Sequence, residues 1–208
     1  MNSAADPLRA RNLRTLAALA GLFLLPLALA FFVYYATGWR PPAHTNHGTL
    51  ITPVRPLPVV ALPQPGRAAA DAPGATPPPA AALFRHQWSL VYVGDGGCDR
   101  SCRDALYVMR QTRLSLNNDM TRLARVFLVS GGCCQREFLA REHPGLVVVD
   151  AGGAESAALL RQFPDVDRAH TLFIVDPLGN LMMSYDVRGN PRGLRDDLRK
   201  LLRLSQIG

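Results

Sequence analysis

The sequence predicts an α/β domain, a mixed sheet with flanking helices, preceded by one N-terminal transmembrane helix. Three observations support this prediction. Residues 16–36 carry no charge, short apolar segments alternate with helix-like segments after residue 84, and the last segments pair as a hairpin followed by a helix. Strands and helices that alternate along a chain are typical of a sheet covered by helices.

Residues 16–36 are expected to anchor the chain in a membrane. This run has 21 residues, and a helix that rises about 1.5 Å per residue crosses a hydrocarbon core of about 30 Å at this length. A cleaved signal peptide is the alternative, because residues 28–30 (Ala-Leu-Ala) resemble a cleavage site. The apolar run is longer than the core of most signal peptides, which favours a retained anchor.

The charges on either side of this span predict its orientation. Three arginines stand close before the span, whereas the two that follow it are more widely spaced: Arg9, Arg11 and Arg14, then Arg40 and Arg55. Positive charges are retained on the cytoplasmic side of a membrane. Residues 1–15 are therefore predicted to be cytoplasmic, and the chain after residue 36 extracytoplasmic.

Residues 37–83 are expected to form an extracytoplasmic linker. Nine of the 17 prolines of the chain lie between residues 53 and 80, together with many alanines. Such a composition favours extended polyproline conformations and forms a semi-rigid spacer. The segment Thr45–Ile51 is less biased in composition, and no role is predicted for it.

Residues 84–208 are expected to fold as one domain, since about 125 residues suffice for a hydrophobic core. The turn Asp176–Asn180 contains Pro and Gly, which predicts a hairpin between the last two strands. Apolar, β-branched segments predict strands, and helix-like spacing of apolar residues predicts helices. The predicted strands are 88–93, 125–129, 146–149, 171–175 and 181–185, and the predicted helices are 101–117, 135–142, 155–163 and 194–204.

The charge of the chain gives little support for nucleic-acid binding. The net charge is +7, but six of the 23 basic and two of the 16 acidic residues precede residue 84. The domain therefore carries 17 basic and 14 acidic residues, a net charge of +3. These charges are mixed along helices rather than clustered, so no nucleic-acid partner is expected.

Cys98 and Cys102 are the strongest candidates for a functional site. They follow the strand predicted at residues 88–93 and a glycine-rich turn, at the beginning of the next predicted helix. In a helix, residues i and i+4 lie on one face. The two sulfurs are therefore placed to share a metal ion or to close a disulfide.

Cys133 and Cys134 are a second pair of thiols. They follow the strand predicted at residues 125–129. If that strand runs parallel to the strand at 88–93, both pairs lie at the same edge of the sheet, where α/β proteins place their sites. Three interpretations stay open: the second pair exchanges disulfides with the first, supplies accessory soft ligands for Cu(I), or forms a structural disulfide with it, as is normal outside the cytoplasm.

The combination of these features resembles the Sco/SenC family of cytochrome c oxidase copper-delivery proteins. The anchor, the Cys-x-x-x-Cys spacing and the late hairpin carry the resemblance, and the run Asp176–Tyr185 is similar to the tails of a smaller group of anchored Sco-like proteins. The resemblance implies a thioredoxin-like fold over residues 84–206. It also implies a location in the bacterial inner membrane, with the domain in the periplasm.

In the Sco family, two cysteines and a distant histidine bind copper, and the cysteines can also act as a thiol-disulfide pair. On this chain the resemblance assigns these roles to Cys98, Cys102 and His170. The chain departs from the family pattern in three respects, one of which is that the turn Gly94–Gly97 is looser than the family's usual sequence. Arg103 stands where the family has a proline, and His170 lies two residues closer to Asp176 than the family's histidine does. A shift of two residues keeps the face of a strand but moves the side chain by about 6.6 Å.

The resemblance also implies a function and partners. The expected function is assembly of a respiratory cytochrome c oxidase, by copper delivery or by thiol maintenance of its copper site, with an oxidase subunit or other assembly factors as partners. Two alternatives stay open. One is a membrane-anchored thiol-disulfide oxidoreductase with another client, in which Cys98 and Cys102 are catalytic. The other is a non-catalytic thioredoxin-like binding domain whose cysteines only stabilise the fold.

Overall fold

The structure, a computed structural model, describes residues 7–37, 45–64, 83–205 and 207 of the chain. The chain divides into two compact units, residues 1–45 and residues 46–208. We predicted a proline-rich spacer in the linker. The part of it that directly follows residue 64 lies outside the described residues.

The first unit contains one long helix, α1, from Pro7 to Ala36. Its segment Ala10–Ala36 is long and apolar enough to cross a membrane, by length and composition. The predicted span of residues 16–36 lies within it. Because a helix that is apolar on all sides requires apolar surroundings, α1 fits a single-pass membrane anchor.

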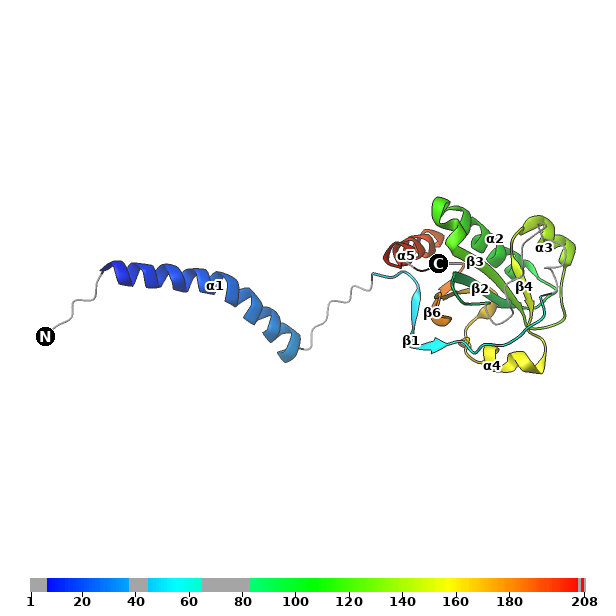
Figure 1. The fold of residues 1–208 in the computed structure, drawn as a ribbon, viewed down its shortest axis with the longest axis horizontal. Coiled ribbons are helices and arrows are strands. Elements are labelled where there is room, and N and C mark those ends of the chain that lie inside the picture. Colours follow the sequence, from blue (N-terminus) through cyan, green and yellow to red (C-terminus); the bar gives the residue numbers. More distant parts are fainter. Residues whose placement is uncertain (1–6, 38–44, 65–82, 206, 208) are drawn as a thin grey trace. The chain divides into compact units, whose positions relative to one another are not determined.

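The second unit is built on a six-stranded mixed sheet in the order β1-β6-β5-β2-β3-β4 (Figure 1). β2, β3 and β4 are parallel, whereas β5 is antiparallel to β2, β6 to β5, and β1 to β6. The predicted strands and the predicted hairpin are thereby confirmed. The strands are β1 Thr49–Pro56, β2 Trp88–Gly94, β3 Leu123–Val129, β4 Val147–Asp150, β5 Thr171–Val175 and β6 Asn180–Asp186.

The helices cover the two faces of the sheet unequally. Figure 1 shows α2, α3 and α5 on one face and the short α4 on the other. The α-helices are α2 Arg100–Leu114, α3 Arg136–Glu142, α4 Ala157–Leu160 and α5 Pro191–Leu204, and the 3-10 turns are η3 Asn117–Arg122, η4 Ala154–Ser156 and η5 Arg168–His170. This mixed sheet with flanking helices is the predicted fold class.

Two buried clusters fill the two faces. Along β2, Leu90 and Tyr92 belong to the cluster under α2 and α5, whereas Val91 and Val93 belong to the cluster on the α4 face. Strands that are buried on both faces read as continuous apolar runs. This burial explains why β2 was recognisable in the sequence.

Two helices are shorter in the structure than the sequence predicts. The helix predicted at residues 101–117 ends at Leu114, and Asn117 beyond it has a left-handed φ of 51°. The helix predicted at residues 155–163 is reduced to α4, Ala157–Leu160. Phe163 precedes Pro164, and the residue before a proline is disfavoured in a helix.

The predicted linker boundary differs from the structure. We expected residues 37–83 to lie outside the domain, but β1 pairs with β6 and extends the sheet. Ile51, Leu57 and Leu62 are buried, with exposed fractions of 8%, 4% and 6%. The prolines of β1 are tolerated because β1 is an edge strand, where a missing N–H need not break the sheet.

After β1 the chain crosses one face of the sheet. The Leu57 N–H donates to the Gly179 carbonyl at 2.9 Å, at the hairpin between β5 and β6. Six residues later, the Pro63 carbonyl accepts a hydrogen bond of 2.9 Å from the Asp150 N–H, at the end of β4. The two bonds hold the segment between the β5–β6 hairpin and the edge strand β4.

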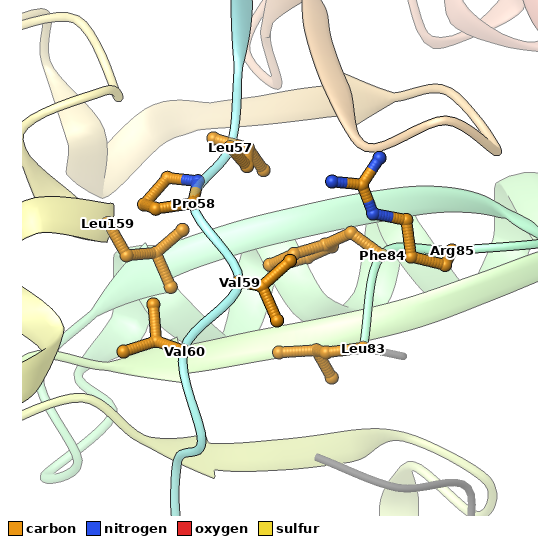
Figure 2. A pocket seen from close by; sticks show the side chains of 8 residues that line it. All are labelled: Leu57, Pro58, Val59, Val60, Leu83, Phe84, Arg85 and Leu159. Carbon is orange, nitrogen blue, oxygen red and sulfur yellow. The ribbon is translucent and has the colours of Figure 1, made fainter. Parts of the chain in front are cut away.

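This crossing segment takes the place of a covering helix. Figure 2 shows residues 57–60 passing between Leu159 of α4 and the chain at Leu83 and Phe84. These side chains line a small apolar pocket, and Phe84 is only 6% exposed. The face of the sheet opposite α2 is therefore covered by α4 together with this crossing segment. The composition of the segment had predicted a spacer rather than a part of the domain.

Candidate functional site

Cys98 and Cys102, the inner pair, lie at the carboxyl end of β2. A turn at residues 95–97 leads from β2 to Cys98, and the Asp95 carboxylate accepts a hydrogen bond from the Gly97 N–H at 2.7 Å. Cys98 itself has a left-handed φ of 42°, which is uncommon for a residue with a side chain. This turn places Cys98 directly before α2.

Asp99 fixes the beginning of α2. Its carboxylate accepts a hydrogen bond of 2.9 Å from the Cys102 N–H, the contact by which aspartate stabilises a helix N-terminus. The Cα atoms of Cys98 and Cys102 are 5.0 Å apart, and their sulfurs are joined in a disulfide. The two residues are only 1% and 2% exposed, so the inner pair is buried.

An open pocket of about 470 Å³ is lined by both residues of the inner pair. The polar residues that line it with them are Tyr92, Asp95, Asp99, Ser130 and Arg168. Tyr92, Asp95 and Asp99 come from β2, the turn after it and the helix cap. Ser130 follows β3, and Arg168 begins η5. The pocket thus opens toward an otherwise buried disulfide.

The pocket combines a neutral phenol with charged groups. Burial raises the pKa of Tyr92 to about 12, with smaller contributions from the negative charges of Asp99 and Asp167. Tyr92 is therefore neutral at pH 7, and its hydroxyl donates to the Ala169 carbonyl at 3.3 Å. The Arg168 guanidinium is held in place by main-chain carbonyls at the end of α4.

Cys133 and Cys134, the outer pair, follow β3. Because β2 and β3 are parallel, with Gly94 opposite Val129, both pairs follow the same edge of the sheet, as we predicted. Cys133 is exposed, whereas Cys134 is half-buried and packs against the cluster that contains the inner pair. The structure joins Cys133 to Cys134, so the disulfide between the two pairs that the sequence left open is not formed.

The loops that carry the two pairs are in direct contact. A Cβ added at Gly96 would clash with the Gly132 carbonyl and lie 2.9 Å from the Cα of Cys133, so only glycine permits this approach. The Gln135 side chain donates to the Gly97 carbonyl at 2.6 Å. The two loops therefore form one surface.

Arg103 strengthens the same contact. Its Nε donates to the Cys98 carbonyl at 3.3 Å, its Nη2 donates to the Gln135 side chain at 3.1 Å, and its guanidinium lies 4.8 Å from the centre of the Phe138 ring. The residue that replaces the proline of the Sco pattern thus connects the inner pair to the loop of the outer pair.

A family model described as a transmembrane-like, thioredoxin-like C-terminal domain matches residues 88–205. The chain belongs to this family. The match covers β2 to α5, and with them both cysteine pairs. No curated protein matches the chain.

Members of the Sco family share the fold of this transmembrane-like, thioredoxin-like domain. Yeast Sco1 with copper bound is 16% identical, with a TM-score of 0.52 over 59% of this chain and 82% of that chain. Apo Sco1 from Thermus thermophilus is 18% identical, with a TM-score of 0.51 over 79% of this chain and 99% of that chain. The likeness to Sco proteins that we predicted is confirmed for the fold.

His170 of this domain is held by a carboxylate rather than by the inner pair. Its Nδ1 lies 2.9 Å from the Asp167 carboxylate, and it ends η5 just before β5. The two residues before it line the pocket, but His170 is not among the lining residues. Within the described residues, no three His, Cys, Asp or Glu side chains gather closely enough to hold a metal ion. The role of His170 as a ligand stays a prediction.

Several residues of the site had no signal in the sequence. Tyr92 could have been placed on the α2 face by the two-residue period of its strand, but not at the pocket. The contacts of Arg103 with Gln135 and of Arg168 with the end of α4 depend on loop conformations. Local sequence patterns do not determine such contacts.

Proposed function

We propose that this protein is a membrane-tethered Sco-like factor that serves the copper site of a respiratory cytochrome c oxidase, by copper delivery or by thiol maintenance. The supporting observation is the Cys98–Cys102 pair, which is buried yet lines an open pocket in a thioredoxin-like domain. Helix α1 is the tether, with residues 1–15 in the cytoplasm and the domain in the periplasm. An oxidase subunit or another assembly factor is the partner.

Reduction of the inner pair supplies the chemistry for copper. Two thiolates on residues whose Cα atoms are 5.0 Å apart are soft ligands, and such ligands select Cu(I). Yeast Sco1, which shares the fold, is known with copper bound. His170 would supply a third ligand through Nε2, since the contact of its Nδ1 with Asp167 is the kind of outer contact that orients a metal-binding histidine.

Anaerobic titration of the full-length reduced protein in detergent with Cu(I), against a chromogenic Cu(I) competitor, tests copper delivery. We expect tight one-to-one binding that the double variant Cys98→Ser/Cys102→Ser loses, because both thiolates are removed. The variant His170→Ala should bind at least ten-fold more weakly, since one of three ligands is lost.

The matched control is the double variant Cys133→Ser/Cys134→Ser, which removes two thiols from the same edge of the sheet. It should keep one-to-one binding. If the wild-type protein binds no more Cu(I) than the Cys98→Ser/Cys102→Ser variant does, copper delivery is wrong. Thiol maintenance is then the remaining function, and it requires that the inner pair is reduced reversibly.

A further inference from the structure

We infer that the outer pair, Cys133 and Cys134, is a second redox centre that passes electrons to the inner pair. In this arrangement an external dithiol reduces the outer pair, while the client reaches the inner pair through the pocket. The inference rests on the proposed function, in that it explains how the inner pair is returned to the dithiol state.

The two pairs differ in their exposure. Cys133 is exposed and Cys134 is half-buried, whereas Cys98 and Cys102 are 1% and 2% exposed. Thiol-disulfide exchange requires a thiolate to reach a disulfide sulfur, so its rate depends on access. A reductant that presents its thiols on a protein surface therefore meets the outer pair more readily than the inner pair.

The two pairs are also next to each other. A Cβ added at Gly96 would lie 2.9 Å from the Cα of Cys133, and the Gln135 N–H and side chain donate to the carbonyls of Gly96 and Gly97 at 3.3 and 2.6 Å. Cys134 packs against the buried cluster to which both inner cysteines belong. Cys134 is thus the outer cysteine on the buried side of the loop, and Cys133 is the one that is exposed to solvent.

These positions assign the steps of the exchange. The external dithiol reduces the Cys133–Cys134 disulfide and leaves as a disulfide, having given two electrons and two protons. The Cys134 thiolate then attacks a sulfur of the inner disulfide, which forms a mixed disulfide and releases one inner thiolate. The Cys133 thiolate attacks Cys134 in that mixed disulfide, so the outer disulfide forms again and the second inner thiolate is released. The two inner thiolates take up the two protons.

The variant Cys133→Ser tests this sequence of steps directly, because it keeps the attacking thiol and removes the resolving thiol. In the full-length protein in detergent, we expect Cys134 to accumulate as a mixed disulfide with an inner cysteine. Peptide mass spectrometry after acid quenching and alkylation detects it. Arg100 lies between Cys98 and Cys102, so tryptic peptides identify which of the two is bound. The matched variant Cys134→Ser should give less of the mixed disulfide.

The rate of inner-pair reduction is the second measurement. With reduced thioredoxin, a protein dithiol, as the probe, the Cys98–Cys102 disulfide should open at least ten-fold more slowly in Cys133→Ser/Cys134→Ser than in the wild-type protein. Equal rates, together with no mixed disulfide in Cys133→Ser, would overturn the relay. That result leaves the proposed function intact if the double variant still binds Cu(I). Failure of the relay and failure of the proposed function are therefore distinguishable.

Discussion

A chain shortened to begin at residue 84 will fail to fold stably, whereas a chain that begins at residue 46 will fold. The shorter chain lacks β1, which forms an edge of the sheet beside β6. It also lacks Ile51, Leu57 and Leu62, each of which is less than 9% exposed. Burial of one such side chain contributes about 1.5–3 kcal/mol. The loss is therefore comparable to the whole stability of a domain, about 5–15 kcal/mol.

Urea unfolding followed by circular dichroism checks this expectation on the two fragments. A pair of point variants separates packing from chain length. Leu57→Ala should lower the free energy of unfolding by about 2–4 kcal/mol, because Leu57 is 4% exposed. Val59→Ala should change it by less than about 1 kcal/mol, because Val59 is 60% exposed. Equal midpoints for the fragments beginning at residues 46 and 84 would show that β1 and the crossing segment are dispensable.

Asp197→Ala will strongly destabilise the domain, because Asp197 ties the beginning of the domain to α5. Its side chain is 5% exposed. It accepts hydrogen bonds from the Tyr185 hydroxyl at 2.6 Å, from the N–H of His47 at 2.7 Å and from the N–H of Gly48 at 3.1 Å, and the His47 Nδ1 also lies 3.1 Å from it. Hydrogen bonds to a charged group each contribute about 1.5–3 kcal/mol, so we expect a loss of at least about 3 kcal/mol.

The same contacts set the pH range in which Asp197 stabilises the fold. Burial by itself raises the pKa of Asp197, but the hydrogen bonds from Tyr185, His47 and Gly48 outweigh it, and the pKa lies below its usual value. The folded state therefore favours the ionised carboxylate more than the unfolded chain does. This stabilisation is present above the unfolded pKa of about 3.9 and is lost as the pH falls through the lower folded pKa.

Urea unfolding at pH 7 measures the effect, with the neighbouring residue as the control. Asp196→Ala should change the free energy of unfolding by less than about 0.5 kcal/mol, since Asp196 pairs with Arg195 at the surface. Tyr185→Phe should cost about 1–2 kcal/mol, because it removes one of the donors. An Asp197→Ala variant as stable as Asp196→Ala would contradict the role given to Asp197.

The central strands were predictable from the sequence because burial leaves a simple pattern. β5, for example, is buried at all five residues, Thr171 to Val175, and its last four residues form an apolar run that is ended by a turn. The inner pair was predictable for a similar reason, since its spacing and the end of β2 are both local features. In each case the physical determinant lies within a few residues of the element itself.

β1 and the contacts around the outer pair were not predictable, because their determinants are distant in sequence. β1 contains Pro53 and Pro56, and prolines argue against a strand when only the local sequence is considered. The strand is stabilised by pairing with β6 about 130 residues later. Arg103 meets Gln135 across 32 residues. These features depend on which segments the fold brings together rather than on local composition.

Reversible reduction of the inner pair is the measurement that decides whether it is a working site. The full-length protein in detergent would be equilibrated in buffers of graded dithiol-to-disulfide ratio, alkylated, and scored for the Cys98–Cys102 disulfide, with circular dichroism in parallel. We predict that the inner disulfide opens and closes reversibly while the domain stays folded, because both copper binding and thiol exchange require the folded dithiol state. An inner disulfide that resists reduction until the domain unfolds would show that it only stabilises the fold.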